Sequence, residues 1–380
     1  MNVVALQKRT DDAPFDRDPE RSFTIPARYY LDADILQQEK EAIFYRNWWY
    51  AGHQSQLAEA GCYLTVQVCD QNIIVIRDKS GELNAYYNVC QHRGHELLFG
   101  SGKVRTITCP YHAWSYGFDG ELKAARNTDK MVDFDKCKFS LKSVQVEVFC
   151  GLVFVNLDPA AESLKVQAAD LETEIREFCP RVDEVKFAQR DDYDVASNWK
   201  IMVDNFLECY HCPVAHKGFS SMIDMDTYKV TTHGIYSSHM AKAKLGENKA
   251  YDIADATVTD HAVWFLWPNL TLMRYPGRGN FMVWRFYPIN ATETWEEFDF
   301  FFESSEPDDS EKEAIRFIDE VLQPEDIGLV ESVQRGMSTP AFNSGRYMVD
   351  IEGSGASEHA VHHFHGLLLN AYQRACNPDA

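Results

Sequence analysis

The stretch from residue 88 to residue 114 concentrates side chains that bind metals. It reads NVCQHRGHELLFGSGKVRTITCPYHAW and holds two mixed pairs, Cys90 with His92 and Cys109 with His112. A structural zinc site usually takes its ligands as one pair of cysteines and one pair of histidines. Here each pair mixes the two types. That order suits an iron–sulfur cluster with two Cys on one iron and two His on the other.

The mixed order therefore predicts a Rieske [2Fe-2S] cluster, with a structural zinc ion as the alternative. Neutral imidazoles in place of two anionic thiolates leave such a cluster less negative and raise its reduction potential. The flanking sequences CQHRG and CPYHAW agree with this interpretation. We interpret His95, the third histidine of the stretch, as a structural residue, because four ligands already complete the cluster.

A second set of metal-binding side chains follows about a hundred residues later, in VDNFLECYHCPVAH. The pattern of SNWKIMVDNFLECYH predicts a helix that runs to Pro213. On that helix Asp204, Glu208 and His211 would face one way, and Pro213 would bend the chain so that His216 approaches the same metal. Two His and one carboxylate form the facial triad of mononuclear iron(II) oxygenases, which leaves positions open for O2.

The third ligand of this predicted iron site must come from another segment. QPEDIGLVESVQRG offers Glu325, Asp326 and Glu331. Cys209 and Cys212 form a C-x-x-C pair that would suit zinc. We take zinc there as the lesser alternative, because on one helix Cys209 and His211 would point to different sides.

The elements that must position these residues fall into two regions. Residues 46–157 alternate with a period of two in stretches rich in Val, Ile, Thr and Tyr, which predicts an all-β domain with the first Cys and His cluster in its loops. Residues 158–380 mix helical and strand patterns, which predicts an α+β catalytic domain. Residues 1–45 are expected to form an N-terminal arm and a helix that pack on the catalytic domain.

Composition narrows the class of protein. The 380 residues carry a formal net charge of -21, which argues against nucleic acid or an anionic membrane surface as a partner. We find no apolar stretch of signal-peptide length at the N-terminus and no run of eighteen apolar residues. We therefore expect a cytoplasmic protein whose ten cysteines are thiols and metal ligands rather than a disulfide framework.

Taken together, the motifs resemble the oxygenase (alpha) component of Rieske non-haem iron oxygenases. The resemblance covers about residues 25–370 and rests on YYNVCQHRGHELL, ITCPYHAW, NWKIMVDNFLECYHCPVAH, PEDIGLVESVQRG and GSGASEHAVHHFHGLL. Within the family, the sequence is most similar to the branch that oxidises quaternary ammonium compounds such as carnitine.

The resemblance implies roles for particular residues and a fold for the second region. It implies that Asp326 is the third iron ligand, beside His211 and His216, and that Glu208 bridges electrons between subunits. It also implies a helix-grip (START-like) catalytic domain, a ring of three subunits, and a separate NADH-dependent reductase that carries a flavin and a plant-type [2Fe-2S] cluster.

A quaternary ammonium substrate has no N–H donors, so aromatic faces and shape must recognise it. The strand-like stretches of the second region supply aromatic candidates for such a cage, with core packing as the alternative for each. The candidates are Tyr236, Trp264, Phe265, Trp267 and Tyr275. Arg274 and Arg278 are candidates for binding a substrate carboxylate.

The histidines of the C-terminal helical segment are His359, His362, His363 and His365. We expect them to serve in helix packing or a subunit contact, with a third metal site as the lesser alternative.

These features predict an NADH-linked monooxygenase that uses O2 to hydroxylate a C–H bond beside a quaternary nitrogen and so cleaves a C–N bond. One alternative is an N-demethylase of glycine betaine or of a proline betaine. An alternative from another class is a Rieske electron carrier without oxygen chemistry.

Overall fold

The computed structural model describes residues 6–9, 12–244 and 246–377. The chain divides into two compact units, one made of Met1–Ile43 with Gln167–Ala380 and the other of Phe44–Val166. Residues 158–166, which the sequence analysis assigned to the second domain, belong to the Phe44–Val166 unit. They are tied there because the carboxylate of Glu147 accepts bonds from the Ser163 hydroxyl (2.9 Å) and the Leu164 N–H (3.0 Å).

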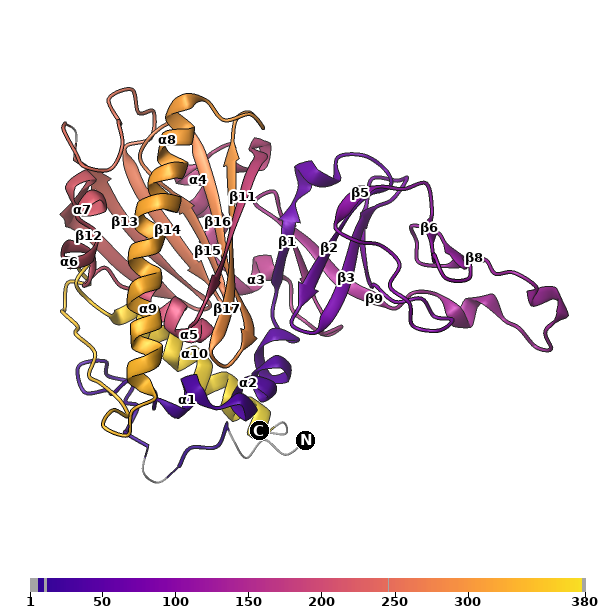
Figure 1. Cartoon of the computed structure of the whole chain (residues 1–380), viewed down its shortest axis with the longest axis horizontal. Helices are drawn as coiled ribbons and strands as arrows, with labels where there is room; N and C mark the ends of the chain where they lie inside the picture. The colour runs from indigo at the N-terminus through magenta and orange to yellow at the C-terminus, as the bar shows by residue number, and fades with distance from the viewer. Residues whose placement is uncertain (1–5, 10–11, 245, 378–380) are drawn as a thin grey trace. The chain divides into compact units, whose positions relative to one another are not determined.

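The Phe44–Val166 unit is built of antiparallel strands, as the period of two predicts (Figure 1). Its larger sheet has the order β1-β10-β9-β4-β3-β2-β5, and a three-stranded sheet has the order β6-β7-β8. The strands are β1 (Trp49–His53), β2 (Cys62–Val68), β3 (Gln71–Arg77), β4 (Leu83–Tyr87), β5 (Ser101–Lys103), β6 (Ile107–Thr108), β7 (Ser115–Tyr116), β8 (Leu122–Ala124), β9 (Ser143–Phe149) and β10 (Leu152–Asn156).

The other unit is built on one seven-stranded antiparallel sheet with the order β11-β17-β16-β15-β14-β13-β12. Its strands are β11 (Lys186–Val195), β12 (Ile223–His233), β13 (Tyr236–Ala243), β14 (Asp260–Leu266), β15 (Leu270–Arg274), β16 (Asn280–Asn290) and β17 (Glu293–Phe302). Its α-helices are α1 (Arg28–Leu31), α2 (Ala33–Glu39), α4 (Leu171–Phe178), α5 (Trp199–Phe206), α6 (Cys212–Ala215), α7 (Lys217–Met222), α8 (Asp309–Phe317), α9 (Gln323–Met337) and α10 (His359–Cys376).

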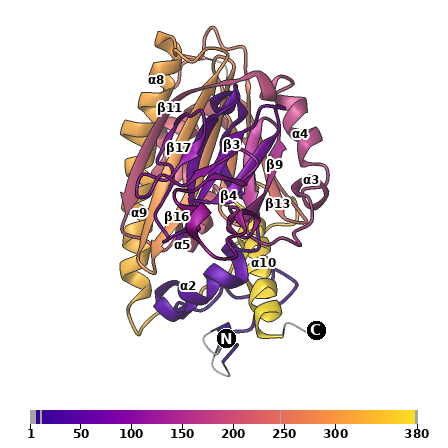
Figure 2. The same cartoon turned by 90° about the vertical axis from the view of Figure 1, so that its right-hand side faces the viewer.

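Helices cover both faces of this sheet (Figure 2). α4 covers one face, where its Glu174 accepts a hydrogen bond from Trp264 of β14. On the other face, Phe206 of α5 packs edge-on against Trp284 of β16, and Phe364 of α10 packs against Phe265 of β14. The arrangement is the mixed α+β architecture that the sequence predicts, with the functional segments α5, α6 and α9 away from α4.

The helix predicted to run to Pro213 is shorter than expected. α5 ends at Phe206, and Leu207 (φ -78, ψ 5) caps it. The chain then leaves the helical path because the N–H of Cys209 donates to the carbonyl of Gly355 (3.1 Å). Pro213 lies in the first turn of the next helix, α6, where a missing N–H costs nothing.

A π-helical turn, Ile318–Leu322, joins α8 to α9 in one long helical segment. The segment lies along the sheet in Figure 1. Such turns are frequent at functional sites, and this one brings Asp326, in the first turn of α9, towards α5. No helix among the described residues is both long enough and apolar enough to cross a bilayer.

Candidate metal centres and active-site cavity

The two Cys-His pairs of the first motif lie in loops with the same backbone hydrogen bonds. In the first loop the N–H of Cys90 donates to the carbonyl of His95 (2.8 Å), and that of Gly94 to the carbonyl of Cys90 (3.0 Å). The second loop repeats both bonds at the same lengths, with Cys109 in the place of Cys90 and Ala113 in that of Gly94. Gly94 (φ 73) and Ala113 (φ 58) are both left-handed. The two loops therefore share one backbone hydrogen-bonding pattern, which presents both Cys-His pairs.

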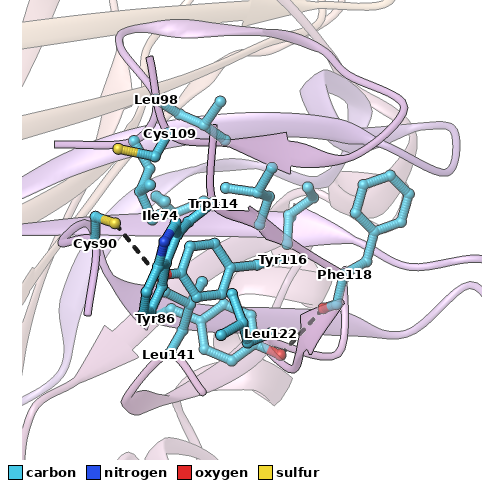
Figure 3. Close-up of a cluster of buried hydrophobic side chains, with 13 residues drawn as sticks. Ile74, Tyr86, Cys90, Leu98, Cys109, Trp114, Tyr116, Phe118, Leu122 and Leu141 are labelled. Atoms are coloured by element: carbon cyan, nitrogen blue, oxygen red, sulfur yellow. Dashed lines mark hydrogen bonds between the residues drawn. The ribbon is translucent and has the colours of Figure 1, made fainter. Parts of the chain in front are cut away.

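The side chains of these loops separate into two buried thiols and two outer imidazoles. Cys90 and Cys109 belong to the apolar core of the unit, and both sulfurs lie at one edge of it in Figure 3. The rings of His92 and His112 lie nearer the surface, with their centroids 4.7 Å apart. Two thiols on the inside and two imidazoles on the outside form the donor set of a Rieske cluster. The residues therefore fit that group.

Tyr116 is placed to tune such a cluster. Its hydroxyl lies 3.3 Å from the sulfur of Cys90 and accepts a bond from the N–H of Gln91 (3.0 Å). A donor on a cluster sulfur stabilises the reduced state. We expect Tyr116→Phe to lower the reduction potential on the order of 50 mV, since a hydrogen bond is worth about 1 kcal/mol. Protein-film voltammetry measures this change in the reduction potential.

Tyr86→Phe is the matched control for that experiment. Tyr86 lies in the same core, but its hydroxyl donates to the carbonyl of Phe118 (3.0 Å) rather than towards a sulfur, as Figure 3 shows. An unchanged potential in Tyr116→Phe, or an equal shift in both variants, would remove the proposed role of the Tyr116 hydroxyl.

The second motif brings three possible ligands of one metal ion together. The Nε2 atoms of His211 and His216 are 3.1 Å apart. Oδ1 of Asp326 lies 3.1 Å from Nε2 of His216 and 3.6 Å from Nε2 of His211. Ligands bound at about 2.1 Å and at right angles to one another are roughly 3.0 Å apart. The residues present thus fit a facial triad.

Each of these three residues bonds to a further polar side chain, at the far nitrogen of the two histidines and at the triad-facing oxygen of Asp326. Oε1 of Glu208 lies 2.5 Å from Nδ1 of His211, and Oε2 of Glu325 lies 2.8 Å from Nδ1 of His216. The amide of Asn205 donates to Oδ1 of Asp326 (2.7 Å). A carboxylate on Nδ1 fixes the tautomer that presents Nε2 to a metal.

Of the three carboxylates considered for the third ligand, Asp326 is the one in the triad. Glu325 binds the far nitrogen of His216, and Glu331 accepts from the N–H of Ala196 (3.2 Å) in the link between β11 and α5.

The electrostatics of the triad favour a cation. Burial alone would lower the pKa of His211, but hydrogen bonds to Asp326 and Glu208 raise it to about 10. Burial alone would raise the pKa of Asp326, but its bonds with His211 and His216 lower it to about 2. The carboxylates thus hold positive charge at this point, which a bound metal ion would supply.

The C-x-x-C pair on either side of His211 is a disulfide. The sulfurs of Cys209 and Cys212 are bonded to each other. The expectation of free thiols or metal ligands is therefore wrong for these two cysteines, and zinc binding by them is excluded in this state because the bond removes both thiolates.

A small cavity of about 80 Å³ opens beside the triad, between α5, α6, α7 and the sheet. His211, His216, Asp326 and Glu208 line part of it. The rest of its wall is mainly apolar or aromatic. It includes Phe206, Phe219, Tyr228, Val263, Met273, Trp284 and Leu322.

Comparison with known proteins places both units in one family. Residues 47–145 match the Rieske [2Fe-2S] domain, and residues 182–374 match the catalytic domain of the ring-hydroxylating alpha subunit. The chain belongs to the Rieske ring-hydroxylating oxygenase family. It is accordingly the oxygenase component of a Rieske system, with a [2Fe-2S] domain and a catalytic domain.

Among relatives of this Rieske oxygenase is the carnitine monooxygenase oxygenase subunit of Escherichia coli (strain K12), 40% identical over 94% of this chain and 96% of that protein. The chloroplastic choline monooxygenase of Beta vulgaris is 33% identical over 93% of this chain and 78% of that protein. A solved quaternary ammonium Rieske monooxygenase in complex with L-carnitine is 36% identical, with a TM-score of 0.86 over 94% of this chain and 98% of that one.

The aromatic residues predicted to form a substrate cage in this Rieske oxygenase do not line the cavity. Tyr236 and Trp264 donate to the carboxylate of Glu174 on α4, at 2.9 and 3.2 Å. Phe265 and Trp267 pack against Phe364 of α10. These four residues serve packing.

The remaining substrate candidates also lie elsewhere. Tyr275 packs edge-on against Tyr251, and Arg274 donates to the backbone carbonyl of Phe178 at the end of α4. Arg278 is not among the residues of the cavity wall.

Trp264 and Arg274 come from the right strands but point to the wrong face, whereas Phe265 shares the face of the cavity but packs against α10. Side chains alternate across a sheet, and Val263 pairs with Met273 on the cavity face, whereas Trp264 pairs with Leu272 on the α4 face. The alternation of His261 and Val263 with Trp264 was visible in the sequence. Which of the two alternating sets of side chains faces the triad was not.

Asp204, grouped in the sequence analysis with the iron site, serves to anchor α5. It accepts from the Tyr30 hydroxyl (2.6 Å) and lies 2.9 Å from Nε2 of His365. Nδ1 of the fully buried His365 lies 2.6 Å from the hydroxyl of Tyr347. One histidine of the C-terminal helix thus holds the helix that precedes Glu208.

The other histidines of α10 have partners too. His362 lies 2.8 Å from the carbonyl of Asp16, His363 lies 3.2 Å from that of Gly234, and His359 pairs with the hydroxyl of Ser357.

Proposed function

We propose that this Rieske oxygenase hydroxylates a C–H bond next to the nitrogen of a quaternary ammonium compound. The observation that carries the proposal is a two-His, one-carboxylate triad that opens onto an aromatic cavity. Phe206, Phe219, Tyr228 and Trp284 offer ring faces, which attract a trimethylammonium group without hydrogen bonds. The relatives named for carnitine and choline are consistent with such a substrate.

In this proposal His211, His216 and Asp326 hold Fe(II), which supplies the activation of O2 when bound. Two electrons and two protons reduce one oxygen atom to water while the other enters the C–H bond. The hydroxylated carbon beside a quaternary nitrogen is unstable, so the C–N bond breaks and releases an amine and an aldehyde. The cavity excludes bulk water and orients the carbon to be attacked.

Electron supply completes the proposal. The [2Fe-2S] cluster at Cys90, His92, Cys109 and His112 receives electrons from a separate NADH-dependent flavin reductase. Glu208, already bound to His211, offers its carboxylate to a cluster histidine of a neighbouring subunit in a trimer. We expect the protein in the cytoplasm, where NADH is available.

A product screen tests the substrate class. The protein, reconstituted with iron and cluster, is incubated with reductase, NADH and O2 over carnitine, γ-butyrobetaine, choline, glycine betaine and proline betaine. We expect an amine and an aldehyde from at least one of them. Formaldehyde with a demethylated amine would establish the N-demethylase instead, and no oxidation of any compound would overturn the substrate class.

A further inference from the structure

His261 is a polar side chain in the cavity wall that the iron site does not use. It lies on β14, is 4% exposed, and its Nδ1 has no hydrogen-bond partner. Its ring packs edge-on against Phe219, 5.2 Å between centroids, and 6.1 Å from the ring of Tyr228. A buried polar atom without a partner is costly in a native protein unless something else satisfies it. His239 also has an unpartnered Nδ1, but of the two only His261 lines the cavity, so only its ring is within reach of a bound substrate.

The charges of the cavity wall limit the kind of substrate group that can bind beside His261. The residues that line the cavity, all of them described, include the carboxyl groups of Glu208 and Asp326 but no lysine or arginine. Away from the triad, a substrate carboxylate placed there would be desolvated without a cationic partner, and the carboxylates of Glu208 and Asp326 would repel it. Burial lowers the pKa of His261 to about 4, so its ring is neutral near pH 7 and offers an uncharged hydrogen bond.

The aromatic side of the cavity complements this neutral group. Phe206 and Trp284 pack edge-on with centroids 5.2 Å apart, and Tyr228 and Phe219 flank His261. Ring faces hold a quaternary nitrogen, and a single imidazole holds one oxygen.

We propose that His261 determines substrate specificity, by hydrogen-bonding an uncharged hydroxyl of a quaternary ammonium alcohol, and that the cavity selects such alcohols over quaternary ammonium carboxylates. The inference rests on the proposed function, since it assigns the second functional group of the same substrate. It makes a choline-type compound a better ligand than a betaine-type compound of similar size.

The test measures binding to the iron-loaded and cluster-loaded protein without O2, by calorimetry. The probes are choline, ethyltrimethylammonium, which has the same carbon skeleton without the hydroxyl, and glycine betaine. In the wild type we expect choline to bind at least about tenfold more tightly than either other compound, as expected for one buried hydrogen bond. In His261→Leu the ratio of choline to ethyltrimethylammonium affinity should fall towards one, and His261→Gln should keep most of it.

His239→Leu is the matched control. His239 is also buried and neutral, with a pKa lowered to about 3 by burial, and lies on the neighbouring strand β13, opposite Val263. It is not among the residues that line the cavity. The affinity ratio should be the same in this variant as in the wild type. Circular dichroism of each variant identifies any that fails to fold, and His261→Gln then gives the comparison.

The outcomes separate the inference from the proposed function. Tighter binding of glycine betaine than of choline, or an affinity ratio that His261→Leu leaves unchanged, overturns the inference and leaves the proposed function standing. If none of the three compounds binds, the inference fails, and the proposed function fails with it only if the product screen also finds no oxidation of any compound.

Discussion

Replacement of His211 with alanine is expected to abolish product formation while the spectrum of the [2Fe-2S] cluster stays unchanged. His211 supplies one of the three ligand atoms of the triad, and its removal leaves Asp326 and His216 to hold the metal alone. We expect the turnover number to fall at least about a thousandfold, since a metal-dependent oxidation has no other route. Product analysis measures the loss, and iron content with electron paramagnetic resonance reports the two metal centres separately.

The same variant separates an oxygenase from an electron carrier. A carrier without oxygen chemistry would accept and pass electrons at the same rate with alanine at position 211. His233→Ala is a suitable control, because His233 is a half-exposed histidine of the same unit that stacks on Tyr236 and does not line the cavity. If the His211 variant forms product at the same rate as this control, the triad does not take part in the reaction.

Replacement of Glu208 with alanine is expected to stop product formation with both metals still bound. One carboxylate oxygen of Glu208 bonds to the ring Nδ1 of His211. The other accepts from the backbone N–H of His211 (3.1 Å). In the proposed trimer it also accepts from a cluster histidine of the neighbour, so its loss breaks the path of the electrons. We expect a loss of at least about a hundredfold, the upper range for removing a partner of a metal ligand. Single-turnover kinetics of the pre-reduced protein measures this loss of product formation.

Glu325→Ala provides the matched control. Glu325 binds Nδ1 of His216 as Glu208 binds Nδ1 of His211, so it orients a ligand without the proposed bridging role. We expect this variant to bind iron about 10–100-fold more weakly, yet to oxidise its cluster at a normal rate once iron is saturated. If the two variants lose single-turnover electron transfer equally, Glu208 only orients His211 and the bridging role is wrong.

The candidate metal centres were readable from the sequence because they are local. A Cys-x-His and a Cys-x-x-His present their ligands within single loops, and His211 and His216 lie five residues apart. Asp326 depended on a resemblance, since from residue types alone Glu325 and Glu331 were equal candidates. Only the packing of α9 against α5 turns Asp326 towards the two histidines and Glu325 to the far side of His216.

The substrate cavity was not readable in the same way. The strand-like stretches were recognised, but each buried strand is apolar on both faces, and the sequence does not mark which face meets the triad. The predicted Trp264 and Arg274 bind α4, whereas their neighbours Val263 and Met273 line the cavity. A shift of one residue along a strand exchanges the two faces.

The sequence by itself predicted the four candidate cluster ligands and the two histidines of the triad, the all-β and α+β division and the family. These depend on short spacings and on the period of two, which the chain carries locally. Tertiary structure alone decided the end of α5 at Phe206, the disulfide between Cys209 and Cys212, the anchoring of Asp204 by His365 and the residues around the cavity. Each of these depends on contacts between segments far apart in the chain, and such contacts exist only once the sheet and helices have packed.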